Sequence, residues 1–404
     1  MIILAIESSC DETAIAILQH QQIPPQKITS SSSEIKKSQN NNCNLYYQSQ
    51  GNVTKILANV INSQIKIHQQ FGGVVPEVAA RNHLANINKL IVEAVAVAKI
   101  NLEDVDYFVA TSGPGLIGGL IVGMMSAKTL SAIYNKKFIA VNHLVGHALT
   151  TRLTADSRFP FLLLLLSGGH CQIILVKNAI SYQVIGETID DALGECFDKV
   201  AQMLGLEYPG GPKIEEIAKN GNPQAIKFPK PLLDNKEHLY NFSFSGLKTA
   251  VMRYIENKTN EKFNHQSFKK LSNIDIADIS ASFQRTIAEI LINRLENTIK
   301  NFTISNLLQQ KMLTEIVISG GVAANRYILN AIQNFINNKF DYFDIKVTTP
   351  PLSLCTDNAV MIGWAAIEEI KHYQQEDKIS KIGDKLDFAP RSNWQLNNLG
   401  KIDN

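Results

Sequence analysis

Two histidines four residues apart are the strongest chemical signal in this chain. They begin and end the run HLVGH (143–147), and on a helix this spacing places the imidazoles of His143 and His147 on one face, within reach of one metal ion. Zinc peptidases use the same spacing, but they carry a glutamate directly after the first histidine as general base, where this chain has Leu144. Asp357, near a predicted helix start, is a candidate third ligand, and a His/His/Asp set with open positions suits a metal whose shell the substrate completes. The alternatives are that the histidines are structural and that Asp357 is an ordinary helix N-cap.

Glycine-bearing turns are the second signal, because glycine lets a ligand approach the backbone and free N–H groups bind phosphate oxygens. Such turns occupy residues 112–115, 167–170, 209–212 and 319–321. The chain has neither a GxxxxGK[ST] nor a GxGxxG run, which argues against P-loop NTPases and Rossmann dehydrogenases. Several such turns in a two-lobed α/β chain fit a nucleotide held between the lobes.

An acidic stretch at 186–199 carries five carboxylates in fourteen residues. On a helix, Asp191, Glu195, Asp198 and Lys199 would lie on neighbouring faces, where solvated ion pairs are the ordinary explanation. The alternative is that one carboxylate holds a ribose hydroxyl.

The elements that must position these groups read as a duplicated α/β fold. Short apolar runs form two expected β-hairpins, 2–6 with 13–18 and 161–166 with 172–176, each opening one mixed half. Further strands are expected at 107–111, 138–141, 315–319 and 345–348. Helices are expected at 78–97, 119–134, 189–204 and 276–299 and from near residues 143, 325 and 357.

One segment does not fit this pattern. Residues 21–52 are rich in Gln, Ser, Asn and Lys, with homopolymer runs at 30–33 and 40–42. Such a sequence offers too little apolar surface to offset the entropy of ordering, so we predict a flexible surface insertion.

Composition limits the class of protein. The chain has 404 residues, 45% of them hydrophobic, and 39 basic against 37 acidic residues give a net charge of +2. This argues against a basic nucleic-acid coat or a polybasic membrane anchor as the main function. The five cysteines are scattered without a CxxC pair, which argues against a disulfide framework or a cysteine zinc site. With no signal-peptide pattern at the N-terminus and no apolar run of about 20 residues, we expect a cytoplasmic protein.

Nine motifs, in order, resemble the bacterial-type tRNA N6-adenosine threonylcarbamoyltransferase family. The resemblance runs from residue 1 to about 368, interrupted by the 21–52 insertion. The motifs are ESSCDET (7–13), GGVVPEVAARNH (72–83), SGPGLIGGL (112–120), NHLVGH (142–147), LSGGH (166–170), GETIDDALGECFDKVAQMLGLEYPGGP (186–212), FSFSGLKTA (242–250), SGGVAAN (319–325) and CTDNAVMI (355–362).

This resemblance implies two RNase H-like lobes of the actin, sugar-kinase and heat-shock-chaperone superfamily around a central cleft. We expect an N-terminal lobe at 1–158 and a C-terminal lobe at 159–404, whose last helix packs back toward the first lobe. The implied reaction transfers the threonylcarbamoyl group from threonylcarbamoyl-adenylate to N6 of the adenosine 3′ of the anticodon and releases AMP. The acceptors would be tRNAs that read codons beginning with A.

The resemblance also assigns residues. His143, His147 and Asp357 match the metal ligands, for one divalent ion per subunit, with Fe²⁺ favoured and Zn²⁺ the alternative. Some relatives add a tyrosine at the SGG turn where this chain has leucine, so only three protein ligands are expected. The residues that match those holding the adenylate are Leu166, Ser167, Gly168, Gly169, His170, Asp198, Gly211 and Asn325.

The chemistry accounts for these residue types. Charge grows on the phosphate of AMP as it leaves, so a metal and glycine-turn N–H groups would stabilise it where it develops. The N6 amine must lose a proton during attack, and Asp11 and Glu12 are the candidate bases, although they could instead orient the metal's waters.

Partners follow from the same resemblance. The resemblance implies two companion subunits, a paralogous actin-like subunit and a small ATPase. A net charge of +2 is compatible with them, because tRNA binding usually uses a basic surface. The alternative functions are a metal-dependent peptidase, an actin-like small-molecule kinase and a non-catalytic scaffold. Leu144 in the base position disfavours the peptidase, the two histidines would be superfluous in a kinase, and the intact His/His/Asp set argues against a scaffold.

Overall fold

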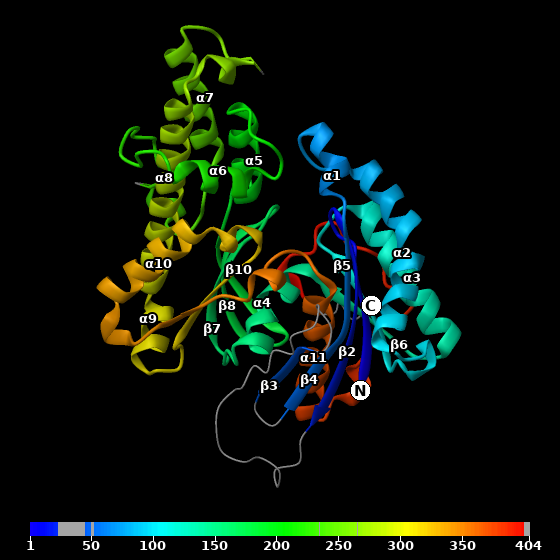
Figure 1. Ribbon diagram of the computed structural model, residues 1–404. Coiled ribbons are helices and arrows are strands. Elements are labelled where there is room, and N and C mark those ends of the chain that lie inside the picture. Colours follow the sequence, from blue (N-terminus) through cyan, green and yellow to red (C-terminus); the bar gives the residue numbers. More distant parts are fainter. Residues whose placement is uncertain (23–44, 50–51, 234, 265, 400–404) are drawn as a thin grey trace.

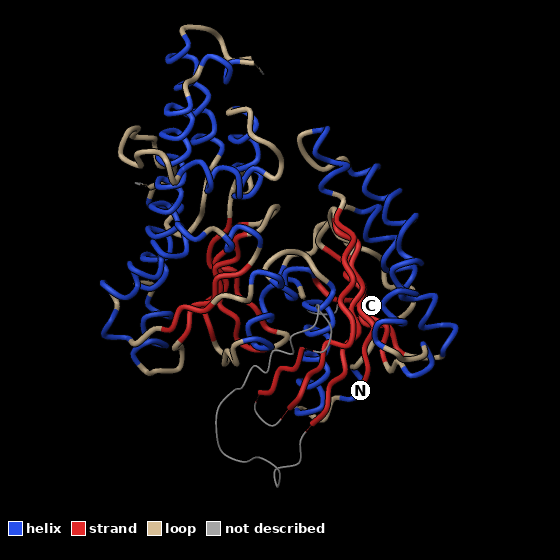
Figure 2. The backbone as a smooth tube through the Cα atoms, viewed as in Figure 1, coloured by secondary structure: helices blue, strands red, loops and turns tan. Residues whose placement is uncertain are grey.

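Two β-sheets, each flanked by helices, divide the chain into two lobes in the computed structural model (Figure 1, Figure 2). The structure describes residues 1–22, 45–49, 52–233, 235–264 and 266–399. The predicted α/β class with two lobes is therefore confirmed.

The first lobe is built on a six-stranded sheet in the order β3-β4-β2-β1-β5-β6. β1 pairs antiparallel with β2 and parallel with β5, which in turn pairs parallel with β6. Helices α2 and α3 cover one face of this sheet, and α1 lies next to α2 beyond the ends of the strands (Figure 1). The elements are β1 (Ile2–Glu7), β2 (Glu12–Gln22), β3 (Leu45–Ser49), β4 (Asn52–Ser63), α1 (Ile65–His68), α2 (Pro76–Ala98), β5 (Tyr107–Gly113), α3 (Ile117–Tyr134) and β6 (Lys137–Asn142).

The second lobe carries a five-stranded sheet in the order β11-β10-β7-β8-β9. β7 pairs antiparallel with β8 and parallel with β10, so β7 and β1 have equivalent connections, as a duplicated fold requires. The elements are β7 (Phe161–Leu166), β8 (Cys171–Asn178), β9 (Ser181–Glu187), α5 (Leu193–Met203), α6 (Gly210–Ala218), α7 (Ser245–Thr259), α8 (Asn273–Ile299), α9 (Phe302–Gln309), β10 (Glu315–Ser319), α10 (Arg326–Lys339) and β11 (Lys346–Thr348). Short 3₁₀ helices lie at Gln69–Phe71, Leu102–Asp104, Lys236–His238, Ser267–Lys270, Gly321–Ala324, Asp341–Phe343, Leu352–Leu354, Ile379–Lys381 and Leu396–Asn398.

β1 and β7 are apolar along most of their length because both faces of each are covered. In β7, Leu162 and Leu164 pack into the core of the second lobe, whereas Leu163 and Leu165 point into a core shared by the two lobes. In β1, Ile3 faces the shared core and Leu4 faces α2 and α3.

The shared core is built around two helices that lie against each other, α4 (His143–Thr154) and α11 (Ala359–Gln375). α11 follows the last strand of the second lobe in sequence, yet it packs against β1 and β2 of the first. The segment after it runs beside β6, where Asp384 bridges to Phe138. We propose to divide the chain between residues 158 and 159, with α11 returning to the first lobe.

Two predictions about local structure were wrong in part. The expected helix at 189–204 begins only at Leu193, because the Asp190 carboxylate before it accepts backbone N–H bonds from Phe244 and Ser245 and is held outside the helix. The expected insertion at 21–52 is ordered at both ends, since β2 runs to Gln22 and strands β3 and β4 occupy 45–49 and 52–63. The rest of that prediction, at 23–44 and 50–51, lies outside the described residues.

Helix α3 is long and apolar enough, by length and composition, to cross a membrane, and among the described helices it alone meets that test. Its buried side carries Leu120 and Met124 and packs against β5 and α2. The fold therefore uses it as a covering helix of the first lobe. Its outer side exposes Ile117, Ile121 and Met125.

Candidate functional site

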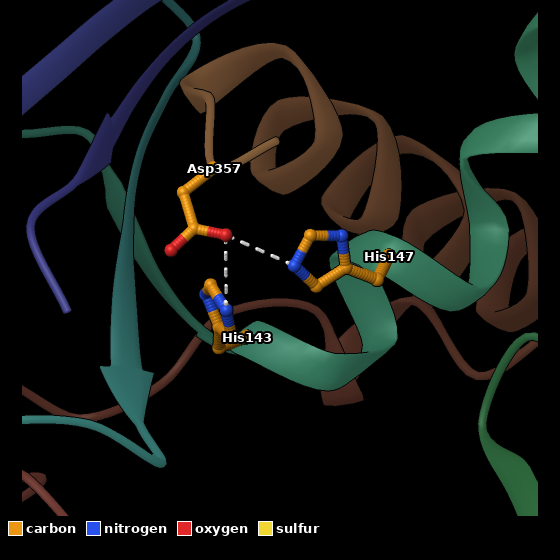
Figure 3. A group of neighbouring side chains, drawn as sticks. All are labelled: His143, His147 and Asp357. Carbon is orange, nitrogen blue, oxygen red and sulfur yellow. Dashed lines mark hydrogen bonds and ion pairs between the residues drawn. The ribbon is translucent and has the colours of Figure 1, made fainter. Parts of the chain in front are cut away.

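The helix that carries both histidines begins where strand β6 ends. The side-chain Oδ1 of Asn142, the last residue of β6, accepts the backbone N–H of Leu144 at 2.9 Å and caps α4. Because the helix starts at His143, His143 and His147 lie one turn apart on one face, with ring centroids 4.8 Å apart (Figure 3). The predicted spacing thus becomes a pair of adjacent imidazoles.

Asp357 completes the cluster from the other side (Figure 3). Its Oδ1 lies 3.1 Å from His147 Nε2 and 3.5 Å from His143 Nε2, and the three potential ligand atoms lie within 4.8 Å of one another. The alternative that Asp357 caps a helix is wrong, since Asn358 caps α11 by accepting the N–H of Met361 at 3.0 Å. This cap leaves the Asp357 carboxylate free to face the histidines.

We expect Asn358→Ala to lower the free energy of unfolding by about 1–2 kcal/mol and to weaken metal binding, because it removes the cap that sets the start of α11. Asn358→Ser keeps a side-chain acceptor and should recover part of the stability. Urea denaturation and metal titration of both variants test this. An equal loss of stability and of metal affinity in the two variants would show that these effects do not come from the missing cap.

Glu7 is a site residue for which we predicted no role from the sequence. Its buried carboxylate lies with Oε2 3.0 Å from His143 Nδ1, and it also accepts the Ser9 N–H at 2.6 Å and the Thr111 hydroxyl at 2.6 Å. This contact places the ring proton of His143 on Nδ1 and leaves Nε2 free to bind a metal. The sequence feature that could have indicated this role is a carboxylate at the end of an otherwise apolar strand.

The charges around the histidines favour a cation. Burial opposes protonation of His143, but the carboxylates of Asp357 and Glu7 raise its pKa to about 9. Burial alone would raise the pKa of Asp357, yet the imidazoles of His143 and His147 hold it well below its usual range. Two buried imidazoles and a carboxylate in this negative field form a donor set that fits a divalent transition metal.

The predicted bases lie next to each other after β1, Asp11 at the end of the turn and Glu12 as the first residue of β2. Asp11 is buried, and Glu12 accepts a hydrogen bond from the Ser63 hydroxyl at 3.3 Å. Burial and the neighbouring negative charges of Asp11 and Asp357 raise the pKa of Glu12 well above its usual range. Glu12 therefore holds a proton at a higher pH than an isolated carboxylate does.

The predicted turn at 166–170 lies beside the cluster of His143, His147 and Asp357. Its His170 is close enough to the two candidate ligands that, together with burial, their imidazoles lower its pKa to about 4. The second glycine turn packs on the first, since a Cβ on Gly320 would lie 2.5 Å from Leu166 O. Ser319, which precedes it, donates its hydroxyl to the carbonyl of His147 at 2.9 Å. Both turns are thus brought to the helix that carries the histidines.

Space for a ligand remains above these turns. Gly168 and Gly169 are exposed, and a Cβ built on either would meet no atom within 4 Å. The same holds for Gly211 and Gly321. These four glycines therefore present backbone that a ligand can approach closely.

The acidic stretch divides into two kinds of carboxylate. Lys199 pairs with Asp191 at 3.1 Å and with Glu195 at 3.0 Å, so the ion-pair interpretation holds for those two acids. Asp198 instead accepts the Gly210 N–H at 2.7 Å. Burial raises the pKa of Asp198 to about 6, with the charges of Asp11 and Glu195 adding to the effect.

Asn325 is placed differently from the other predicted ligand residues. Its Oδ1 accepts the Ile328 N–H at 3.0 Å as the cap of α10, and its amide donates to Gln284 Oε1 at 2.8 Å. Both ends of the side chain therefore form hydrogen bonds within the protein, and its predicted contact with the adenylate stays a prediction.

A cleft of about 710 Å³ opens between the lobes, with residues 66–72 of the first lobe on one wall and Asp198 and residues 202–208 of the second on the other. Tyr208 on the second wall is close enough to Asp11 and Asp198 that their charges, together with burial, raise its pKa. Asp11, one of the two predicted bases, therefore lies near two residues of this wall, Tyr208 and the predicted adenylate-binding residue Asp198.

Comparison with known proteins gives consistent matches. A family model described as tRNA N6-adenosine threonylcarbamoyltransferase matches residues 55–364. A relative of that name from Sinorhizobium medicae is 43% identical over 396 residues, 98% of this chain and 95% of the relative. One from Rickettsia rickettsii is 42% identical, covering 98% of each chain. A solved full-length HypF in its phosphate- and nucleotide-bound form is similar in fold alone, with TM-score 0.51 and 13% identity over 92% of this chain and 46% of that chain.

Proposed function

This chain belongs to the tRNA N6-adenosine threonylcarbamoyltransferase family, a family of tRNA-modifying transferases, and from this premise we propose how its residues carry out the reaction. The donor is threonylcarbamoyl-adenylate, which releases AMP. The acceptor is N6 of the adenosine 3′ of the anticodon in tRNAs that read codons beginning with A. The observation that carries the proposal is the meeting of His143, His147 and Asp357 beside two glycine turns.

His143, His147 and Asp357 would hold one divalent metal ion, Fe²⁺ by preference and Zn²⁺ as the alternative. When bound, such an ion supplies a positive charge near the phosphate of the leaving AMP. Glu7 orients His143 for this role through its 3.0 Å contact with Nδ1.

Backbone N–H groups of the 167–170 and 319–321 turns would bind the adenylate, with Asp198 accepting from a ribose hydroxyl. Asp11 and Glu12 would remove the proton that N6 loses as it attacks the carbonyl carbon, and the raised pKa of Glu12 supports this assignment. A peptidase is disfavoured because Leu144, in the position of the peptidase base, is a buried core residue.

Gly211→Ala should weaken adenylate binding by about tenfold while leaving stability within about 0.5 kcal/mol, because the added methyl occupies open space that the ligand needs. Gly210→Ala is the contrasting variant. Its Cβ would lie 2.4 Å from Ala201 Cβ, so it should destabilise the protein. Thermal unfolding measures the stability of both variants, and titration measures their adenylate affinity. Wild-type adenylate affinity in Gly211→Ala would show that Gly211 does not contact the ligand.

Adenylate binding should weaken as the pH falls below about 6. The pKa of Asp198 is raised to about 6 in the folded protein, so as the pH falls this carboxylate takes up its proton at a higher pH in the folded state than in the unfolded state. Protonation therefore favours the folded state. It also removes the negative charge that would accept a hydrogen bond from the ribose. Titrations between pH 5 and pH 8 with wild type and Asp198→Asn test this. The inflection should vanish in the variant, and its persistence would assign it to another group.

We further propose that this chain works in the cytoplasm with a paralogous actin-like subunit and a small ATPase. The near-neutral charge supports a need for companions. So does the outer side of α2 and α3, where large apolar side chains including Leu84, Val92, Ile121 and Met125 are exposed.

Reconstitution tests the function as a whole. The purified protein is combined with the companion subunits, the adenylate-forming enzyme, threonine, bicarbonate, ATP and unmodified tRNA, and the nucleosides are separated by chromatography. Threonylcarbamoyladenosine should accumulate with the wild-type protein. Its absence would contradict the proposed reaction.

A further inference from the structure

The motif FSFSGLKTA (242–250) takes no part in the mechanism above, yet it forms one wall of a groove on the second lobe. The groove has a volume of about 500 Å³ and lies between the start and middle of α7 and the segment 226–229. The side chains that matter for its chemistry are Lys227, Phe228, Arg253, Tyr254 and Asn257.

Charge distinguishes this groove from the other large cavities. Its lining includes two cations, Lys227 and Arg253, and no carboxylate. Both side chains are exposed, and neither forms an ion pair with any residue that the structure describes. The interlobe cleft sets Asp198 and Glu207 against one lysine, and a third cavity at the end of α10 carries only acidic charges. The groove on α7 is therefore the one of these three that suits a polyanion.

Aromatic and amide groups lie beside the two cations. Phe228 is buried and supports Tyr254 edge-on, with ring centroids 6.1 Å apart at an interplanar angle of 75°. Tyr254 itself is half-buried, and Asn257 exposes its amide. A ring held in place next to unpaired cations is the combination that binds single-stranded nucleic acid, since the cations contact phosphates and the ring stacks on a base.

The groove is joined to the reaction site through a short series of contacts. Asp190 accepts from the Ser245 hydroxyl at 2.7 Å, so the start of α7 is tied to the residues just before α5. Lys248 of α7 pairs with Asp191 at 2.5 Å. Gly194, in the first turn of α5, donates its N–H to Ser167 of the first glycine turn at 3.3 Å. Asp190 and Gly194 are four positions apart in the chain, a span of at most about 14 Å.

We propose that this groove binds the tRNA backbone next to the reacting adenosine, with Lys227 and Arg253 on phosphates and Tyr254 stacked on an unpaired base. The inference rests on the proposed function, because it takes tRNA as the substrate. A net charge of +2 over the whole chain is too small to bind tRNA, and the proposal attributes tRNA binding to this local cationic surface instead.

The test is tRNA binding by the assembled protein, measured by fluorescence anisotropy over a series of salt concentrations. Lys227→Glu with Arg253→Glu should weaken binding at least tenfold and reduce the slope of log affinity against log salt by about 1 to 2. Lys177→Glu with Lys311→Glu makes the same charge change at exposed sites elsewhere on this lobe and should leave both quantities near wild type. Tyr254→Leu should weaken binding with the salt slope unchanged.

The two levels of inference fail in different ways. Three results would contradict the assignment of this groove to tRNA. They are wild-type tRNA affinity in the Lys227/Arg253 double variant, an equal loss of tRNA affinity in the control variant, and no tRNA binding by the wild-type protein. In the first two cases the proposed function stands. Wild-type protein that binds tRNA through these residues but forms no threonylcarbamoyladenosine would overturn the function and leave the groove in place. Adenylate affinity should be the same in all these variants.

Discussion

Replacing His143 and His147 together by alanine should remove the bound metal and lower the rate of threonylcarbamoyl transfer by about 100- to 1,000-fold. The two imidazoles are two of the three potential ligands, and Asp357 alone does not hold a divalent ion tightly. A metal ion stabilises a developing negative charge in the transition state by several kcal/mol. A change of about 1.4 kcal/mol in the activation free energy changes the rate tenfold. Metal content by elemental analysis and nucleoside yield in the reconstituted reaction measure the two effects.

Loss of fold is the competing explanation, because His147 is fully buried. Asp357→Asn keeps the shape of the side chain while removing its charge, and it should lower metal content and rate in the same direction. His372→Gln changes a histidine in the last turn of α11, which pairs with Glu376 and not with the cluster, and it should alter neither quantity. Full activity of a metal-free double variant with an intact fold would show that the cluster does not take part in the reaction.

Glu7→Gln should weaken metal binding by about 10- to 100-fold, the usual effect of losing a carboxylate that orients a ligating histidine. The substitution keeps the size of the side chain but removes the negative charge that fixes the proton on His143 Nδ1. The metal dissociation constant, measured by competition with a chelator of known affinity, reports the change.

Thr111→Val provides the matched control. It removes one donor to the Glu7 carboxylate, the 2.6 Å bond from the threonine hydroxyl, and leaves the contact with His143 in place. We expect a much smaller change in metal affinity. Equal affinities in Glu7→Gln and wild type would mean that His143 is oriented by Ser9, whose hydroxyl lies 3.1 Å from the same nitrogen.

Local sequence patterns predicted strands and helices correctly where a single interaction determines the secondary structure. Continuous apolar runs placed β1 and β7, because a strand covered on both faces needs apolar residues throughout. The prediction of a flexible insertion was wrong at the ends of the 21–52 segment. Pairing with β4 extends β2 through the polar residues Gln21 and Gln22, and β3 pairs with β4 while Tyr47 is buried in the shared core. Backbone hydrogen bonds between strands overrode composition only at Gln21 and Gln22.

The sequence by itself determined that His143 and His147 share one helix face, because the period of the α-helix decides which residues are neighbours at four residues' separation. Only the tertiary structure decided what those imidazoles meet. Asp357 is 210 residues from His147, and Glu7 is 136 residues from His143. Their approach depends on α11 returning to the first lobe and on β1 ending beside α4. Packing of the shared core sets that arrangement, and with it the raised pKa of His143, since burial and charge at a site come from the whole fold.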